Sequence, residues 1–198
     1  MKRKEYSAGM VKHSFWFQEF RQVMHLLAGG KTMAEIKLMS QEENIFMASS
    51  KDRATMIFNT VAGRIKSLPQ GFYALFEESD LSSQKVIALL GVMASDTLFF
   101  DFMYEIFREK LIIGVDNMSL SDMAIFFKNK QLQSPKVAGW KDNTLKRLAG
   151  SYKTILLEAG LLERSSQKIL KPILDRTLED CLKENNLTVM LGILRGER

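Results

Sequence analysis

The segment from Ser95 to about Leu111 carries apolar side chains on nearly every side of a predicted helix. Its apolar residues are Leu98, Phe99, Phe100, Phe102, Met103, Ile106 and Phe107. A helix that is apolar all round is stable only when other elements surround it. We therefore predict that this helix is the central element of the fold.

The apolar runs are too short for a membrane protein. The longest, from Val86 to Ala94, has only half of the ~20 residues that a helix needs to cross a bilayer. The basic N-terminal stretch lacks the apolar region and the small-residue cleavage site of a secretion signal. A single cysteine, Cys181, excludes an internal disulfide and is typical of a reducing compartment. We expect a cytoplasmic protein without a membrane partner.

The rest of the chain also has the apolar spacing of helices, interrupted by only three prolines. Ser14 and Asp142 are candidate N-caps, Thr32 and Glu35 form a capping box, and Gly160 is a typical helix stop. The predicted helices cover residues 14–28, 32–39, 50–68, 72–77, 82–93, 95–111, 121–130, 135–140, 143–158 and 173–184. We predict a mainly α, compact protein with two packed lobes, residues 1–70 and 71–198.

Two stretches have the layout of a helix-turn-helix unit. In the first, residues 32–39 would support a recognition helix over 50–68; in the second, residues 121–140 would support one over 143–158. After the second unit, residues 161–163 and 168–171 flank a polar turn and favour a small β-hairpin, the wing of a winged helix-turn-helix. Runs this short do not separate strand from helix, so both readings stay open.

The charge distribution points to a polyanionic partner. Residues 128–153 hold seven Lys or Arg and one acid, Asp142, whereas an ordinary solvated helix face mixes both signs. The basic ends (residues 1–66 and 128–198, net +5 and +6) surround an acidic middle (67–127, net −6). The candidate DNA-binding residues are Lys136, Lys141, Asn143, Thr144, Lys146, Arg147, Ser151, Lys153, Arg164 and Lys168, together with Arg53, Arg64 and Lys66 on the first unit.

Each predicted recognition helix carries a glycine, Gly63 or Gly150, in the middle of its exposed face. Glycine at such a position costs ~1 kcal/mol relative to alanine. Close approach of a phosphate backbone or of another helix would explain this cost. Drift at an exposed site explains it equally well, and both readings stay open.

The sequence contains no motif of a known catalytic, metal or cofactor site. Residues 28–32 end like a P-loop, but His25 stands where its first glycine is needed and a helix precedes it. His13 and His25 have no second ligand at metal-binding spacing, and Cys181 on a helix is typical of a small apolar residue. We expect no enzymatic activity, no metal and no cofactor.

Six long and unusual sequence blocks are KHSFWFQEF, EENIFMAS, DLSSQK, LFFDFMYEIFREKL, IFFKNKQLQSPKVAGW and TLKRLAGSYKTILLEAGLL. In these blocks, which run in order from about Tyr6 to Leu162, the chain resembles the BrxA family of bacterial BREX phage-defence systems. The resemblance implies a mainly helical protein that is encoded beside a methyltransferase and ATPases. It also implies a DNA-binding accessory role without known catalysis, and it supplies no functional residues to carry over.

Charge and resemblance together predict a non-catalytic accessory protein that binds double-stranded DNA, with other BREX subunits as further candidate partners. Two alternatives stay open. A protein–protein adaptor would use Gly63 and Gly150 to seat partner helices, and an RNA-binding helical module would use the same basic faces for another polymer.

Overall fold

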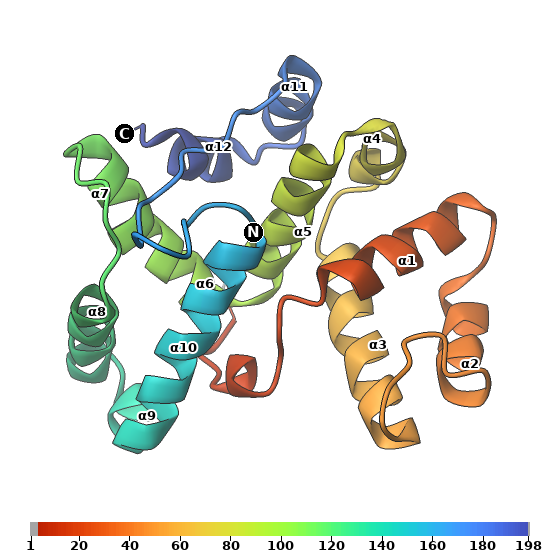
Figure 1. The fold of residues 1–198 in the computed structure, drawn as a ribbon, viewed down its shortest axis with the longest axis horizontal. Helices are drawn as coiled ribbons and strands as arrows, with labels where there is room; N and C mark the ends of the chain where they lie inside the picture. The colour runs from red at the N-terminus through yellow and green to blue at the C-terminus, as the bar shows by residue number, and fades with distance from the viewer. Residues whose placement is uncertain (1–3, 198) are drawn as a thin grey trace.

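The computed structural model describes residues 4–197, and nearly all of its regular structure is helical (Figure 1). The predicted mainly α fold is confirmed. The elements are η1 (Gly9–Val11), α1 (Phe17–Ala28), α2 (Met33–Glu42), α3 (Lys51–Lys66), α4 (Gly71–Glu78), α5 (Leu81–Ser95), α6 (Thr97–Phe102), η2 (Met103–Phe107), α7 (Arg108–Ile112), α8 (Leu120–Gln133), α9 (Pro135–Ala138), α10 (Asp142–Glu158), α11 (Arg176–Glu184) and α12 (Thr188–Arg195).

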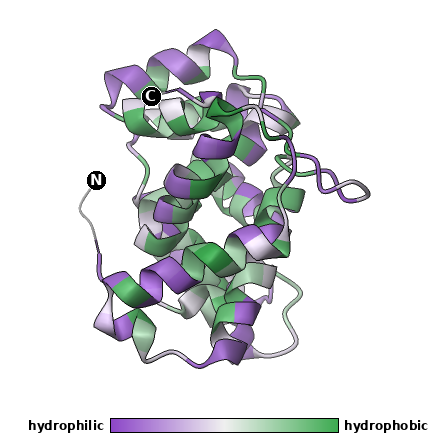
Figure 2. Ribbon diagram, turned by 90° about the vertical axis from the view of Figure 1, so that its left-hand side faces the viewer, coloured by the Kyte–Doolittle hydropathy of each residue, from purple (hydrophilic) through white to green (hydrophobic). Residues whose placement is uncertain are grey.

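The predicted central helix forms as α6, η2 and α7, in which η2 is a π-helical segment. Helix α6 and η2 lie in the core, whereas α7 has no buried residue and lies at the edge of the molecule (Figure 1). Leu98, Phe99 and Phe102 are fully buried, and α5 beside them is buried over most of its length. Hydrophobic residues gather between the helices, and hydrophilic residues occupy the outer surfaces (Figure 2). Burial of these apolar side chains is the main force that holds the fold together.

Within the described residues, no single helix is long and apolar enough to cross a membrane. The helices Leu81–Ser95 and Thr97–Ile112 reach the necessary length and composition only as a pair, and a bend of 112° separates them.

Helices α1 to α4 lie on one side of α5, and α7 to α10 lie on the other (Figure 1). Helix α3 packs against α1, α2 and α5, while α8 packs against α9 and α10. The helices of both predicted helix-turn-helix units therefore form and pack within their units. The apolar core is continuous across residue 70, and the division into two lobes stays a prediction.

The chain before α1 runs between α3 and α10, which flank it on either side (Figure 1). Three buried or half-buried bonds hold this segment in place. The Tyr6 hydroxyl donates to Asp101 Oδ2 (2.6 Å), and the Lys4 amide donates to Thr97 Oγ1 (2.9 Å). The Arg64 guanidinium donates to the carbonyl oxygen of Ser14 (2.9 Å). The N-terminal segment is thus part of the folded protein and forms the base of the site described below.

Several predicted helix ends are wrong by a few residues. Helix α1 begins at Phe17 rather than after a Ser14 cap, because Trp16 adopts a left-handed conformation (φ 51°). Lys141 rather than Asp142 is the N-cap of α10. Helix α11 begins at Arg176, where the Asp175 side chain accepts a bond from the Leu178 amide. Helix α12 was not predicted.

The C-terminal end of α10 leads into a short extended hairpin. Gly160 has φ +78°, and the Leu161 amide donates back to Leu156 O, which is the Schellman pattern that ends helices. Glu163 N then donates to Lys168 O (2.8 Å), and Leu170 N donates to Leu161 O (2.9 Å). Residues 116–118 pair with the outer side of residues 167–169. The hairpin reading is therefore correct over residues 161–170, although only isolated β-bridges form within the described residues.

Candidate nucleic-acid interface

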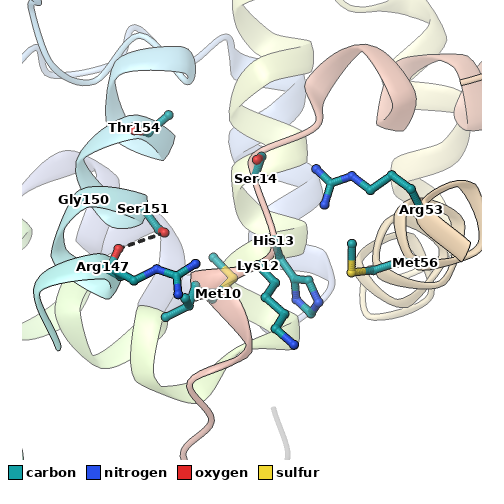
Figure 3. A pocket seen from close by; sticks show the side chains of 11 residues that line it. Met10, Lys12, His13, Ser14, Arg53, Met56, Arg147, Gly150, Ser151 and Thr154 are labelled. Atoms are coloured by element: carbon teal, nitrogen blue, oxygen red, sulfur yellow. Dashed lines mark hydrogen bonds between the residues drawn. The ribbon is translucent and has the colours of Figure 1, made fainter. Parts of the chain in front are cut away.

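The two predicted recognition helices, α3 and α10, lie on opposite sides of one cleft, with the N-terminal segment at its base (Figure 3). The cleft has a volume of about 560 Å³. Helix α3 contributes Arg53 and Met56, and α10 contributes Arg147, Gly150, Ser151 and Thr154. The segment between them contributes Met10, Val11, Lys12, His13 and Ser14.

Three cations from three separate elements line this cleft. Lys12 comes from the N-terminal segment, Arg53 from α3 and Arg147 from α10, and no acidic side chain is among the lining residues. Within residues 4–197, none of the three cations has an acidic partner within 4.0 Å. The Arg53 guanidinium lies 5.0 Å from the centre of the Trp16 ring, a cation–π distance that restricts its motion. The cleft is therefore electropositive.

A second hollow of about 620 Å³ continues from the cleft along α3 and shares Met10, His13 and Met56 with it. Two acids, Asp52 and Asp96, line this second hollow, so the positive charge is concentrated at the α10 end. Gly63 lines the second hollow and Gly150 lines the cleft. A Cβ atom at either glycine would have no other atom within 4 Å, which confirms that both are exposed.

His13 lies between the cleft and the second hollow and is half-buried. Burial is the main cause that lowers the pKa of its imidazole, and the positive charges of Arg64, Arg53 and Lys12 lower it further. The ring is therefore neutral at neutral pH. No group of three or more His, Cys, Asp or Glu side chains among residues 4–197 is placed to hold a metal ion.

Arg64, a candidate DNA-binding residue on α3, is buried rather than exposed. Its side chain is only 2% exposed, and its guanidinium donates to the carbonyl oxygens of Phe15 (2.5 Å) and Ser14 (2.9 Å). Burial lowers its pKa to about 10, so the group remains charged at neutral pH. Arg64 connects α3 to the N-terminal segment.

The other predicted residues lie around the cleft rather than in it, apart from Arg53, Arg147 and Ser151. Lys146 is exposed, but it lines a separate groove between α8 and α10. Lys136 pairs with Glu5 (2.8 Å), and Lys168 pairs with Asp116 (3.3 Å), so both are partly neutralised. The remaining predicted side chains are exposed or half-buried at the surface: Lys66, Lys141, Asn143, Thr144, Lys153 and Arg164.

Sequence reasoning missed the contribution of the N-terminal segment. Lys12, His13 and Ser14 were not among the candidate site residues, although they form the base of the cleft. Thr154, also missed, completes the α10 wall one turn after Gly150. The basic character of the N-terminal stretch was visible in the sequence. Its place between α3 and α10 was not, since contacts this distant along the chain leave no periodic pattern.

Comparison with known proteins gives three results. A family model described as BrxA matches residues 4–186. The chain is 34% identical over 199 residues to a relative from Bacillus cereus (strain H3081.97) named "BREX protein BrxA", and the match covers the whole of both chains. The fold is similar to the crystal structure of an uncharacterized protein from Magnetospirillum magneticum, with a TM-score of 0.80 at 17% identity over 98% of this chain and 100% of that one.

Proposed function

Because the chain belongs to the BrxA family, we propose that it is a non-catalytic accessory protein of a bacterial BREX phage-defence system that binds double-stranded DNA. Its relative is named a BREX protein, which supports the assignment to the defence system. The binding of DNA is argued from the charges of the chain itself.

The observation that carries the proposal is a set of cations without acidic partners on and beside α10. Within the described residues, no acid lies within 4.0 Å of any of these side chains: Lys141, Lys146, Arg147, Lys153 and Arg164. On α11, by contrast, Arg176 and Lys183 both pair with Asp180, as is usual on a solvated helix. Unpaired cations gathered around one helix favour binding to phosphates, because each one can displace a counterion from the duplex.

The arrangement around α10 supports the same proposal. Helices α8 and α9 precede it and pack together, and the hairpin of residues 161–170 follows it. This order matches a winged helix-turn-helix unit, in which the third helix enters the major groove and the hairpin reaches the backbone. Arg164 and Lys168 are exposed at this hairpin, where they would contact phosphates.

A second candidate function, a protein–protein adaptor, is favoured by one observation. The groove between α8 and α10 has a volume of about 650 Å³ and is lined partly by apolar side chains, among them Phe127, Leu145 and Ala149. Leu120, at its edge, is 60% exposed. A helix of another defence subunit would fit such a groove, and the two functions are compatible because Arg147 and the groove lie on different sides of α10.

The test is the affinity of the purified protein for duplex DNA, single-stranded DNA and RNA of matched sequence, measured by fluorescence anisotropy over a salt series. We expect the duplex to bind best. The logarithm of its affinity should fall linearly with the logarithm of salt concentration, with a slope of about −0.9 per phosphate contact. Preference for RNA, or duplex binding that does not respond to salt, would overturn the proposal.

A further inference from the structure

We infer that the cleft between α3 and α10 is a phosphate-binding site that holds one phosphate group of the DNA backbone between Arg53, Arg147 and Lys12, with His13 as an additional donor. This inference rests on the proposed function and deepens it. It places the ligand between the two helices, whereas the sequence suggested two independent recognition helices.

Three cations from distant parts of the chain line the cleft. Lys12, Arg53 and Arg147 are separated by 41 and 94 residues along the chain, yet their side chains line one cleft of about 560 Å³ (Figure 3). Like charges that share a cavity repel one another, and no lining acid offsets this repulsion. An anion bound among them would remove the repulsion. The guanidinium groups of Arg53 and Arg147 are suited to this, because each presents paired donors that match two oxygens of a phosphate.

The shape of the α10 wall also favours a phosphate ligand. Gly150 stands at its centre, with Ser151 and Thr154 beside it, and apart from its chain neighbours and the backbone of α10 no atom lies within 4 Å of the place where a Cβ would stand. A sugar–phosphate chain can therefore approach the helix backbone closely at this point. The Ser14 and Thr154 hydroxyls line the same space and are suitable donors to phosphate oxygens.

The imidazole of His13 lies where its proton responds to an anion in the cleft. The charged groups that line its two cavities come from the N-terminal segment, α3, the start of α6 and α10: Lys4, Lys12, Asp52, Arg53, Arg64, Asp96 and Arg147. In the free protein, burial and the nearby cations lower the pKa of the imidazole. A phosphate in the cleft adds a negative charge and raises that pKa again. Phosphate binding is therefore accompanied by proton uptake, and affinity rises as pH falls.

The chain has only two histidines, which makes a direct test possible by NMR of the imidazole Hε1 signals. His25 lies on α1, is exposed and interacts with Glu77, so it serves as an internal reference. The spectra are recorded over a pH series for the free protein, with duplex DNA and with inorganic phosphate. We expect duplex DNA to raise the titration midpoint of His13 by about one pH unit and to leave His25 unchanged.

Variants at the cleft residues connect the His13 NMR signal to phosphate binding in the cleft. Arg53→Gln and Arg147→Gln should each suppress the His13 response and weaken duplex binding by about tenfold. Arg21→Gln, at an exposed cation on α1 outside the cleft, should change neither. His13→Gln should abolish the rise in duplex affinity that we expect between about pH 8 and about pH 6. An unchanged His25 signal and melting temperature would confirm that each variant is folded.

The two ligands separate this inference from the proposed function. If duplex DNA binds while the His13 midpoint stays in place, the cleft is not the phosphate site, and the inference is overturned while DNA binding stands. If inorganic phosphate raises the His13 midpoint but DNA does not bind, the site takes free phosphate and the DNA-binding function is overturned. If duplex DNA and inorganic phosphate both leave His13 unchanged and no duplex binds, both are overturned.

Discussion

At the scale of single residues, Arg64 positions the base of the cleft between α3 and α10, although its own side chain does not line that cleft. Its guanidinium donates to the carbonyl oxygens of Phe15 and Ser14 and so fixes the chain just after Lys12 and His13. The Tyr6 hydroxyl holds the start of the same segment through Asp101. The base of the cleft is therefore positioned from both ends by buried or half-buried polar contacts, which are costly to break in an apolar interior.

Arg64→Ala should lower the free energy of unfolding by about 3 kcal/mol, because one buried and one half-buried hydrogen bond to carbonyl oxygens lose their charged donor. Chemical denaturation measures this change. Lys66→Ala is the matched control, since Lys66 is exposed on the same helix, and we expect its effect to stay within about 0.5 kcal/mol. An Arg64→Ala variant as stable as the wild-type protein would contradict this account, because the two carbonyl oxygens would then have lost their charged donor at no cost.

At the scale of elements, the spacing of apolar residues predicted helices α3 and α10 well. Ile57 and Val61 on α3 and Tyr152 on α10 are buried as the helical period requires. Residue spacing did not predict the burial of Arg64. The N-terminal segment, 50 residues away in the sequence, packs over that side of α3. Residue spacing also failed to predict the start of α1, where Trp16 adopts a left-handed conformation.

The site was also predictable only in part, because contacts between residues far apart in the sequence form it. Composition singled out the basic stretch that holds Arg147, and the two exposed glycines marked the faces of α3 and α10. The convergence of these faces depends on how α3 and α10 pack around α5 and α6, and on Lys12 lying between them. Such contacts are long-range, so no local pattern encodes them.

Gly150→Ala should separate stability from binding at the scale of helix α10. The added methyl group meets no atom within 4 Å, so the gain in helix propensity should raise the free energy of unfolding by up to about 1 kcal/mol. The same methyl group projects into the cleft, and duplex affinity should fall. Thermal melting and fluorescence anisotropy measure the two effects.

Gly91→Ala on α5 is the contrasting variant. Its Cβ would lie 3.2 Å from the carbonyl oxygen of Arg64, so the close packing of α3 on α5 should make this change destabilising.

If Gly150→Ala leaves DNA binding unchanged, then the backbone of α10 does not approach a ligand, and the glycine reflects drift at an exposed position.

At the scale of the whole molecule, folding brings the two basic ends of the chain to one place. Lys12 and Arg53 belong to the basic first third of the sequence, and Arg147 belongs to its basic last third. The acidic middle, residues 67–127, supplies all of α4 to α7, including the buried core helices α5 and α6. The net charge of +5 is modest, so its arrangement around the cleft, rather than its size, is the argument for a polyanionic partner.

We expect this local arrangement of charge to bind duplex DNA, and a pair of matched double variants tests that binding. Lys146→Glu with Arg147→Glu changes the surface of α10, while Arg21→Glu with Lys37→Glu makes the same change in net charge at exposed residues of α1 and α2, on the far side of α3 (Figure 1).

The measurement is duplex affinity over a salt series for the wild-type protein and both double variants, with melting temperature as the check on folding. We predict that the α10 variant loses most of its binding and that its salt slope becomes shallower by about two, because two phosphate contacts are lost. The α1–α2 variant should bind like the wild-type protein. Equal loss in both variants would mean that only net charge matters, and full binding by a folded α10 variant would contradict the claim.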